Sequence, residues 1–171
     1  MKFPNMKLLV VRHAKAEERD DFSRKSPNDD LRPLTAEGRE IMADSAKRIH
    51  KWAGTPDLLV SSTLVRAIQT AEILAAEFGI KEFARISQLA PDESPMEFLK
   101  WLEKTVAGKS RKMVCCVGHE PHLSLMCSYF LTGEARSFID FKKSGACLLE
   151  FPDGVVEERA AILRWHIPPK T

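Results

Sequence analysis

Short apolar segments alternate with longer segments of helical periodicity along the chain, and this alternation constrains the fold more than any other feature of the sequence. Residues 7–11 are too few and too β-branched for a helix and are typical of a buried central strand. Further strands are predicted at residues 57–60, 85–89 and 112–117, with a helix in each interval between them. We therefore predict an α/β fold, a three-layer sandwich in which helices flank a central, mostly parallel sheet.

Residues with strong end preferences mark the first two predicted helices. Thr35 is suited to cap the first helix, which we expect to end near Gly54. The second helix covers residues 63–78, and Gly79 is a good residue to end it. Residues 17–34 are polar and carry turn-forming residues, so they are predicted to form a long loop rather than a linker between domains.

The second half of the chain adds two helices and a hairpin. One helix is predicted to open at Ser94, and another at Pro121, because proline at the first helical position gives up no useful N–H. Two strand-like segments, residues 146–151 and 160–165, flank a turn signal at residues 152–154. We expect these two segments to pair as a hairpin at one edge of the sheet.

Length and charge exclude several classes of protein. A chain of 171 residues with 44% hydrophobic residues is expected to form a single domain, residues 1–171. Lys and Arg number 26 against 24 Asp and Glu, and the interspersed net charge of +2 argues against nucleic acid or a membrane surface as partner. The longest apolar run is five residues, 113–117, whereas a membrane span needs about 20. We predict a cytoplasmic protein and, by default, a monomer.

Four cysteines without any CxxC spacing are typical of buried, reduced thiols. Three of them, together with two histidines, could instead suggest a zinc site: Cys115, Cys116, Cys127, His119 and His122. Adjacent residues of a strand point to opposite faces of the sheet, so Cys115 and Cys116 are not expected to bind one ion. Buried thiols are the preferred interpretation.

Cationic and histidine side chains follow three of the predicted strands. Arg12 and His13 end the first strand, Arg66 lies one turn into the helix after the second, and His119 follows the strand at residues 112–117. Open α/β sheets place their sites at the carboxyl ends of strands, so these side chains are expected to face one crevice. Arginine binds phosphate through two parallel hydrogen bonds, and imidazole can be a nucleophile. Each residue alone would be ordinary, but the set predicts a phosphate site.

Four segments, in the same order along the chain, resemble the histidine phosphatase superfamily with its phosphoglycerate-mutase-like fold. They are residues 9–16 with the Arg-His pair, residues 30–38, residues 61–72 with the second arginine, and residues 117–121 with the second histidine. The resemblance covers about residues 7–165, which is almost the whole chain. The short length, the alanine after the Arg-His pair and the Gly-His-x-Pro form are most similar to SixA-type phosphohistidine phosphatases.

The resemblance implies a role for each matching residue. His13 would attack phosphorus and carry the phosphoryl group, which water would then remove. Arg12, Arg66 and His119 would hold the equatorial oxygens, and Ser62 would contribute to substrate binding. The resemblance implies no metal and no cofactor, because cationic and donor side chains occupy the place that Mg²⁺ takes in metal-dependent phosphoryl transfer.

The general acid that phosphomonoesterases of this fold supply is not assigned by the sequence. Glu120 follows the second histidine directly but is also suited to cap its helix, and Asp92 and Glu93 lie in a loop where they could simply be solvated. Imidazole, once protonated, leaves from a P–N bond more readily than an alkoxide leaves from a P–O bond. A site without a dedicated acid therefore favours phosphoramidates.

The predicted function is therefore metal-independent hydrolysis of phosphohistidine on a protein through a covalent phosphohistidine intermediate. A small-molecule phosphomonoesterase or mutase is the nearest alternative, in which residues 17–34 and 90–96 close over a phosphorylated molecule. A non-catalytic module that binds phosphate is a third, although binding alone would not require His13 in the pocket.

Overall fold

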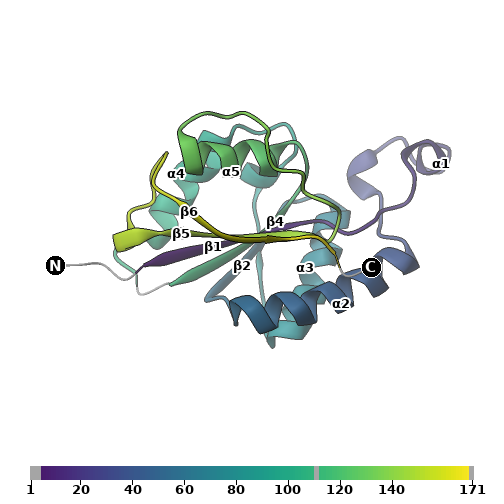
Figure 1. Cartoon of the computed structure of the whole chain (residues 1–171). Coiled ribbons are helices and arrows are strands. Elements are labelled where there is room, and N and C mark those ends of the chain that lie inside the picture. Colours follow the sequence, from purple (N-terminus) through teal and green to yellow (C-terminus); the bar gives the residue numbers. More distant parts are fainter. Residues whose placement is uncertain (1–4, 110–111, 170–171) are drawn as a thin grey trace.

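A computed structural model describes residues 5–109 and 112–169, in which six strands form one sheet with helices on both of its faces (Figure 1). The strands are β1 (Met6–Arg12), β2 (Leu58–Ser61), β3 (Ala84–Arg85), β4 (Met113–Gly118), β5 (Ala146–Phe151) and β6 (Ile162–Ile167). The α-helices are α1 (Arg19–Ser23), α2 (Ala36–Ala53), α3 (Val65–Phe78), α4 (Pro95–Val106) and α5 (His122–Thr132). Short 3-10 turns are η1 (Asp29–Leu31), η2 (Ser87–Leu89) and η3 (Pro152–Gly154).

The sheet is mixed, with its parallel part at the centre and one edge. The strand order is β3-β2-β4-β1-β5-β6. Pairings β2–β3, β2–β4 and β1–β4 are parallel, whereas β1–β5 and β5–β6 are antiparallel. The prediction of a mostly parallel sheet with a hairpin at one edge is therefore confirmed, and β6 is that edge.

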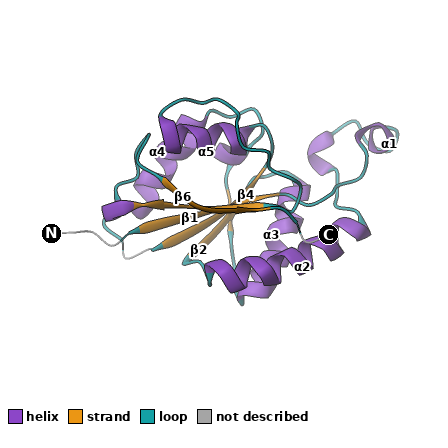
Figure 2. Ribbon diagram, in the orientation of Figure 1, coloured by secondary structure: helices purple, strands orange, loops and turns teal. Residues whose placement is uncertain are grey.

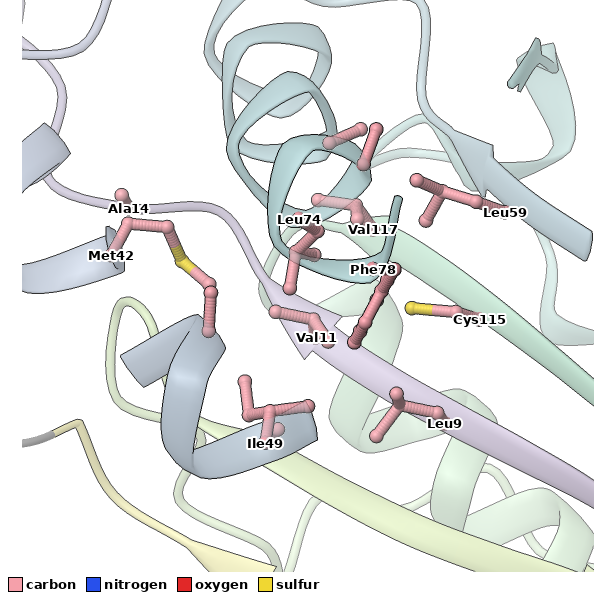
Figure 3. Packing of buried hydrophobic residues seen from close by; sticks show 14 of the residues in the cluster. Leu9, Val11, Ala14, Met42, Ile49, Leu59, Leu74, Phe78, Cys115 and Val117 are labelled. Carbon is pink, nitrogen blue, oxygen red and sulfur yellow. The ribbon is translucent and has the colours of Figure 1, made fainter. Parts of the chain in front are cut away.

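Helices α2 and α3 cover one face of the sheet, and α4 and α5 cover the other, as Figure 2 shows. Strand β1 is buried on both faces because its side chains alternate between two apolar clusters. Leu9 and Val11 pack toward α2 and α3 (Figure 3), whereas Leu8 and Val10 belong to the cluster beneath α4 and α5. This arrangement is the predicted three-layer sandwich.

The helix ends agree with their predicted caps. The Thr35 hydroxyl accepts a hydrogen bond from the Gly38 N–H at 2.9 Å, and α2 begins at Ala36, directly after Thr35. Gly54 and Gly79 end α2 and α3, both with positive φ angles of 82° and 70°. Glycine at these positions accepts a left-handed backbone conformation that a side chain would strain.

Several predicted elements differ from the structure. Residues 17–34 are not only loop, because they contain α1 and η1. The strand predicted at residues 85–89 shrinks to β3, since η2 turns the chain and buries Leu89. Helix α5 begins one residue after Pro121, and β6 lies two residues beyond its predicted position of 160–165. No helix among the described residues is long and apolar enough to cross a membrane.

Candidate active site

The register of three neighbouring strands places their carboxyl ends side by side. Arg12, the last residue of β1, is paired with Gly118, the last residue of β4. Ser61, which ends β2, is paired with Val117. The chain therefore delivers the residues after β1, β2 and β4 to one edge of the sheet, as predicted. Helix α1 projects beyond this same edge (Figure 1).

His13 and His119 face each other at this edge. Their ring centroids lie 4.9 Å apart, with an angle of 52° between the ring planes. The His13 Nδ1 lies 2.7 Å from the carbonyl oxygen of Ala14, which can only accept, so Nδ1 carries the proton in the neutral ring. Nε2 is then the nitrogen with the free electron pair, and it makes no hydrogen bond to any residue that the structure describes.

Backbone hydrogen bonds fix the position of His13 on both sides. Its N–H donates to the Gly118 carbonyl at 3.0 Å, and its carbonyl accepts from the Ser144 N–H at 3.3 Å. The next N–H, that of Ala14, donates to the Thr70 hydroxyl of α3 at 3.0 Å. The nucleophile candidate is therefore held by β4, by α3 and by the segment before β5. Such rigid support is what a reacting group requires.

Two arginines approach the histidines with part of each guanidinium already bound. Arg12 donates from Nη1 to the Phe141 carbonyl, and Arg66 donates from Nη1 to the Asp29 carbonyl at 3.0 Å. The Nε atoms of both arginines are buried and have no hydrogen-bond partner among residues 5–109 and 112–169, and the same holds for both ring nitrogens of His119. Arg66 is only 4% exposed.

Burial lowers the pKa of both histidines. Desolvation, followed by the positive charges of Arg66 and Arg12, lowers the pKa of His13 to about 3. Desolvation, together with His13 and Arg66, lowers the pKa of His119 to about 2. Both rings are neutral at pH 7, so the Nε2 electron pair of His13 is available for attack on an electrophile.

These nitrogens together fit an oxyanion. A buried donor without an acceptor costs about 1–3 kcal/mol, so a site that keeps several of them is suited to a ligand with several acceptor oxygens. A tetrahedral phosphoryl group supplies such oxygens, and Arg12 and Arg66 supply the opposite charge. With the nucleophilic nitrogen of His13 beside them, the arrangement can bind a phosphoryl group and accept it covalently.

The pKa shifts lead to a first testable prediction. In the free protein, the ring signals of His13 and His119 should not titrate between pH 8 and pH 5, because both pKa values lie below that range. Inorganic phosphate should raise both pKa values, since a neighbouring anion favours the imidazolium form. Long-range proton–nitrogen spectra over a pH series, with and without phosphate, test this directly.

The assignments for that titration come from the single variants H13Q and H119Q, each of which removes one signal set. A midpoint near pH 6.5 for either ring in the free protein would contradict the deduced protonation state.

The structure gives Glu120 and Ser62 local partners at helix N-termini. Glu120 Oε1 accepts from the Ser124 N–H at 3.0 Å in the first turn of α5, although the N-cap of that helix is Pro121 and not Glu120 as weighed from the sequence. Burial raises the pKa of Glu120, while Arg12 opposes that shift, so this carboxyl group lies near the arginine. The Ser62 hydroxyl is buried and accepts weakly from the Leu64 N–H at 3.4 Å. Their roles toward a substrate stay predictions.

The other acid candidates lie at the surface. Asp92 and Glu93 are exposed in the turn before α4. The charge of Asp92 acts on the buried His122 and raises the pKa of that ring, against the larger lowering by burial. By contrast, the charges with the largest effect on the pKa of His13 are positive: Arg66, Arg12 and Lys143.

The cysteines are placed as the preferred interpretation predicted. All four are buried and free, and Cys115 and Cys116 point into opposite clusters. Across residues 5–109 and 112–169, no three His, Cys, Asp or Glu side chains are grouped so that they could hold a metal ion. The residues considered for zinc therefore do not come together.

Some contacts at the site were not predicted. The sequence carried no signal for the Phe141 and Ser144 backbone groups, which reach Arg12 and His13 from more than a hundred residues away. Asp29 was also missed, although it directly precedes residues 30–38, one of the four segments that carried the family resemblance. A carboxylate placed directly before that segment is the one signal that could have drawn attention to it.

Comparison with known proteins identifies the family. The model of the histidine phosphatase superfamily, branch 1, matches residues 8–90, which include Arg12, His13 and Arg66. An uncharacterised protein of Picosynechococcus is 36% identical over 142 residues, or 82% of each chain. The chain belongs to the histidine phosphatase superfamily. Membership supports a phosphatase that acts on phosphorylated substrates.

Solved structures of this superfamily share the fold. The protein histidine phosphatase SixA, complexed with tungstate, matches with a TM-score of 0.80 and 17% identity over 95% of this chain and 97% of its own. A phosphoserine phosphatase from Entamoeba histolytica matches with a TM-score of 0.65 and 16% identity, over 94% of this chain and 96% of its own. A mycobacterial glucosyl-3-phosphoglycerate phosphatase matches with a TM-score of 0.68 and 15% identity, over 94% of this chain and 97% of its own. At these identities the likeness concerns the histidine phosphatase fold.

Proposed function

We propose that this histidine phosphatase hydrolyses phosphohistidine on a protein, through a covalent intermediate on His13 and without a metal ion. The observation that carries the proposal is the neutral His13 ring, whose Nε2 stands free among buried donors of Arg12, Arg66 and His119. A protein that only binds phosphate would not require a nucleophile beside these donors. This supports an enzyme over a non-catalytic module.

The proposed reaction has two displacement steps. The Nε2 electron pair of His13 forms a bond to phosphorus while the P–N bond to the substrate imidazole breaks. The departing nitrogen keeps the electron pair of that bond and takes up a proton from solvent water. Water then attacks phosphorus, the P–Nε2 bond breaks, and phosphate leaves with His13 again neutral. In both steps Arg12, Arg66 and His119 donate to the equatorial oxygens, where negative charge is spread in the transition state.

The charges around His13 support the phosphoramidate substrate. The largest charge effects on its ring come from the cations Arg66, Arg12 and Lys143, and Glu120 uses one carboxylate oxygen to accept the Ser124 N–H. An alkoxide leaving group would need an acid held beside it, whereas a protonated imidazole leaves readily. The site therefore suits a P–N bond better than a P–O bond.

A phosphomonoesterase is the second candidate, and one observation favours it. Burial raises the pKa of Glu120, which is the direction that a general acid needs. Two proteins of the same fold act on phosphomonoesters by name, the phosphoserine phosphatase and the glucosyl-3-phosphoglycerate phosphatase. In this alternative Glu120 would protonate the departing alkoxide.

Turnover on matched substrates separates the two candidates. We expect the highest kcat/KM on a phosphohistidine protein, lower values on free phosphohistidine, and the lowest on p-nitrophenyl phosphate and phosphoserine. Replacing Glu120 by glutamine should leave phosphohistidine turnover within about threefold, because no dedicated acid is required for that leaving group.

The opposite order of kcat/KM, combined with loss of monoester turnover in E120Q, would support the phosphomonoesterase instead. Turnover should survive incubation with EDTA, and a loss that zinc restores would contradict the metal-independent mechanism.

A further inference from the structure

Asp29 joins the segment beyond the sheet edge to the arginine on α3. Its carbonyl oxygen accepts from Arg66 Nη1 at 3.0 Å, and its Oδ2 lies 3.4 Å from the same nitrogen. The Arg66 side chain is 5% exposed, so this contact is shielded from water on the arginine side. Both the backbone and the side chain of Asp29 therefore hold one end of the Arg66 guanidinium.

Asp29 is itself held in place by a second arginine. Arg32 donates from Nε to Asp29 Oδ1 at 2.7 Å and from Nη2 to Oδ2 at 3.4 Å, and its own side chain is 11% exposed. Arg32 Nη1 also donates to the Glu17 carbonyl at 2.8 Å. The exposed Arg19 of α1 lies 3.5 Å from Asp29 Oδ1. The carboxylate is thus oriented by partners on both sides of η1.

The ionised form of Asp29 is the relevant one. The hydrogen bonds from Arg32 lower the pKa of Asp29, and the charges of Arg32, Arg66 and Arg19 act in the same direction. Asp29 therefore stays negative throughout the neutral pH range. A permanent carboxylate next to an arginine that should bind a phosphoryl anion is unexpected on charge alone, since it repels the ligand.

The atoms left over on Arg66 resolve this conflict. Asp29 occupies Nη1, whereas Nη2 makes no hydrogen bond to the described residues and Nε is buried without a partner among them. A guanidinium is planar, so fixing Nη1 also fixes the direction in which Nε donates. The carboxylate therefore orients the donor for the oxyanion site rather than competing with the ligand for it.

We propose that Asp29 is a positioning residue for phosphoryl transfer, which holds Arg66 so that Nε donates to the phosphoryl group. This inference rests on the proposed function, in which Arg66 binds the transferred group. It assigns Asp29 of η1 a role at the reacting centre, although this residue belongs neither to the sheet nor to its covering helices.

Charge and positioning predict opposite effects for one substitution, and this makes the test sharp. If Asp29 acted only through its charge, Asp29→Ala would remove repulsion and would leave kcat unchanged or higher. If Asp29 positions Arg66, Asp29→Ala should lower kcat by about 10–100-fold, as loss of an orienting partner does at metal sites, while KM changes less than threefold. Asp29→Asn should lie between, because its amide oxygen can still accept from either arginine.

Asp30 provides the matched control. It is the adjacent residue of η1, it is exposed, and its charge also acts on Arg66, but its side chain has no hydrogen bond or ion pair in the part of the chain that the structure describes. Asp30→Asn should retain kcat within about twofold. Equal losses in D29N and D30N would overturn the positioning role and indicate a charge effect.

A double-mutant cycle then tests whether Asp29 acts through Arg66. In an Arg66→Met background, D29A should change kcat by less than about threefold, because the residue it orients is gone. A full additional loss in that background would contradict the inference. Urea unfolding of each variant accompanies the kinetics, and D29N carries the test if D29A is too unstable to assay.

The two proposals can fail separately. If the wild-type protein turned over no phosphorylated substrate, the proposed function itself would be wrong. If the wild type were active and D29A retained its full kcat, only the positioning role of Asp29 would be wrong.

Discussion

Replacing His13 by alanine should lower phosphatase turnover by at least about 10⁴-fold, the scale on which enzymes lose activity when their nucleophile is removed. The mechanism has no substitute for the Nε2 electron pair, because His119 is 2% exposed and the side chains whose charges act most strongly on His13, Arg66, Arg12 and Lys143, are cations. The variant should still bind vanadate or phosphate, since the buried donors of Arg12, Arg66 and His119 remain. Steady-state kinetics and calorimetric titration measure these two quantities independently.

The covalent step can be observed directly in the same variant. Wild-type protein quenched with alkali during turnover should carry a phosphoryl group that acid removes, as expected for a P–N bond, and H13A should carry none. His50→Ala is the matched control, because that histidine pairs with Glu77 and Thr55 at the end of α2, outside the site. Labelling that persists in H13A would place the nucleophile elsewhere.

Replacing Arg66 by methionine should lower kcat/KM by about 10³-fold, near the upper end of what loss of one transition-state donor costs in enzymes. The residue is buried, and it supplies both a full charge and an Nε donor in surroundings where such interactions are stronger than in water. This variant should bind phosphate and vanadate more weakly than the wild type does, whereas H13A should retain that binding. The two variants therefore separate chemistry from binding.

Arg85→Met is the matched control for the arginine substitution, because Arg85 is exposed on the edge strand β3. It should retain full activity. Arg66→Lys should recover only a small part of the loss, since a lysine keeps the charge but cannot use one planar group for both Asp29 and the phosphoryl oxygens. Full activity in R66K would show that charge alone suffices and that the direction of Nε is unimportant.

Elements with strong local signals could be predicted from the sequence. The apolar run of β1 and β4, the Thr35 cap and the glycines at the ends of α2 and α3 all report on residues close in the chain. The convergence of Arg12, His13 and His119 also followed, because the carboxyl ends of parallel strands meet at one edge. Here a general rule of sheet topology replaced missing knowledge of tertiary contacts.

Elements that depend on distant partners could not be predicted. Residues 85–89 have the composition of a strand, but Leu89 is buried beneath α4 and α5 instead, which turns the chain into η2 after two strand residues. The Asp29–Arg66 contact joins a 3-10 turn to a helix, and no periodicity reports such a pair. At residues 85–89, packing overrides the local preference for a strand, and the Asp29–Arg66 contact exists only in the folded chain.

The position of β1 in the sheet also has a consequence for folding. Leu8 is flanked by Val114 on one side and by Leu149 on the other, so the first strand of the chain has both of its neighbours far along the sequence. Contacts of such long sequence separation form late and slow the folding of a domain. The nucleophile candidate at the end of β1 can therefore acquire its buried, neutral state only after β4 and β5 have been synthesised.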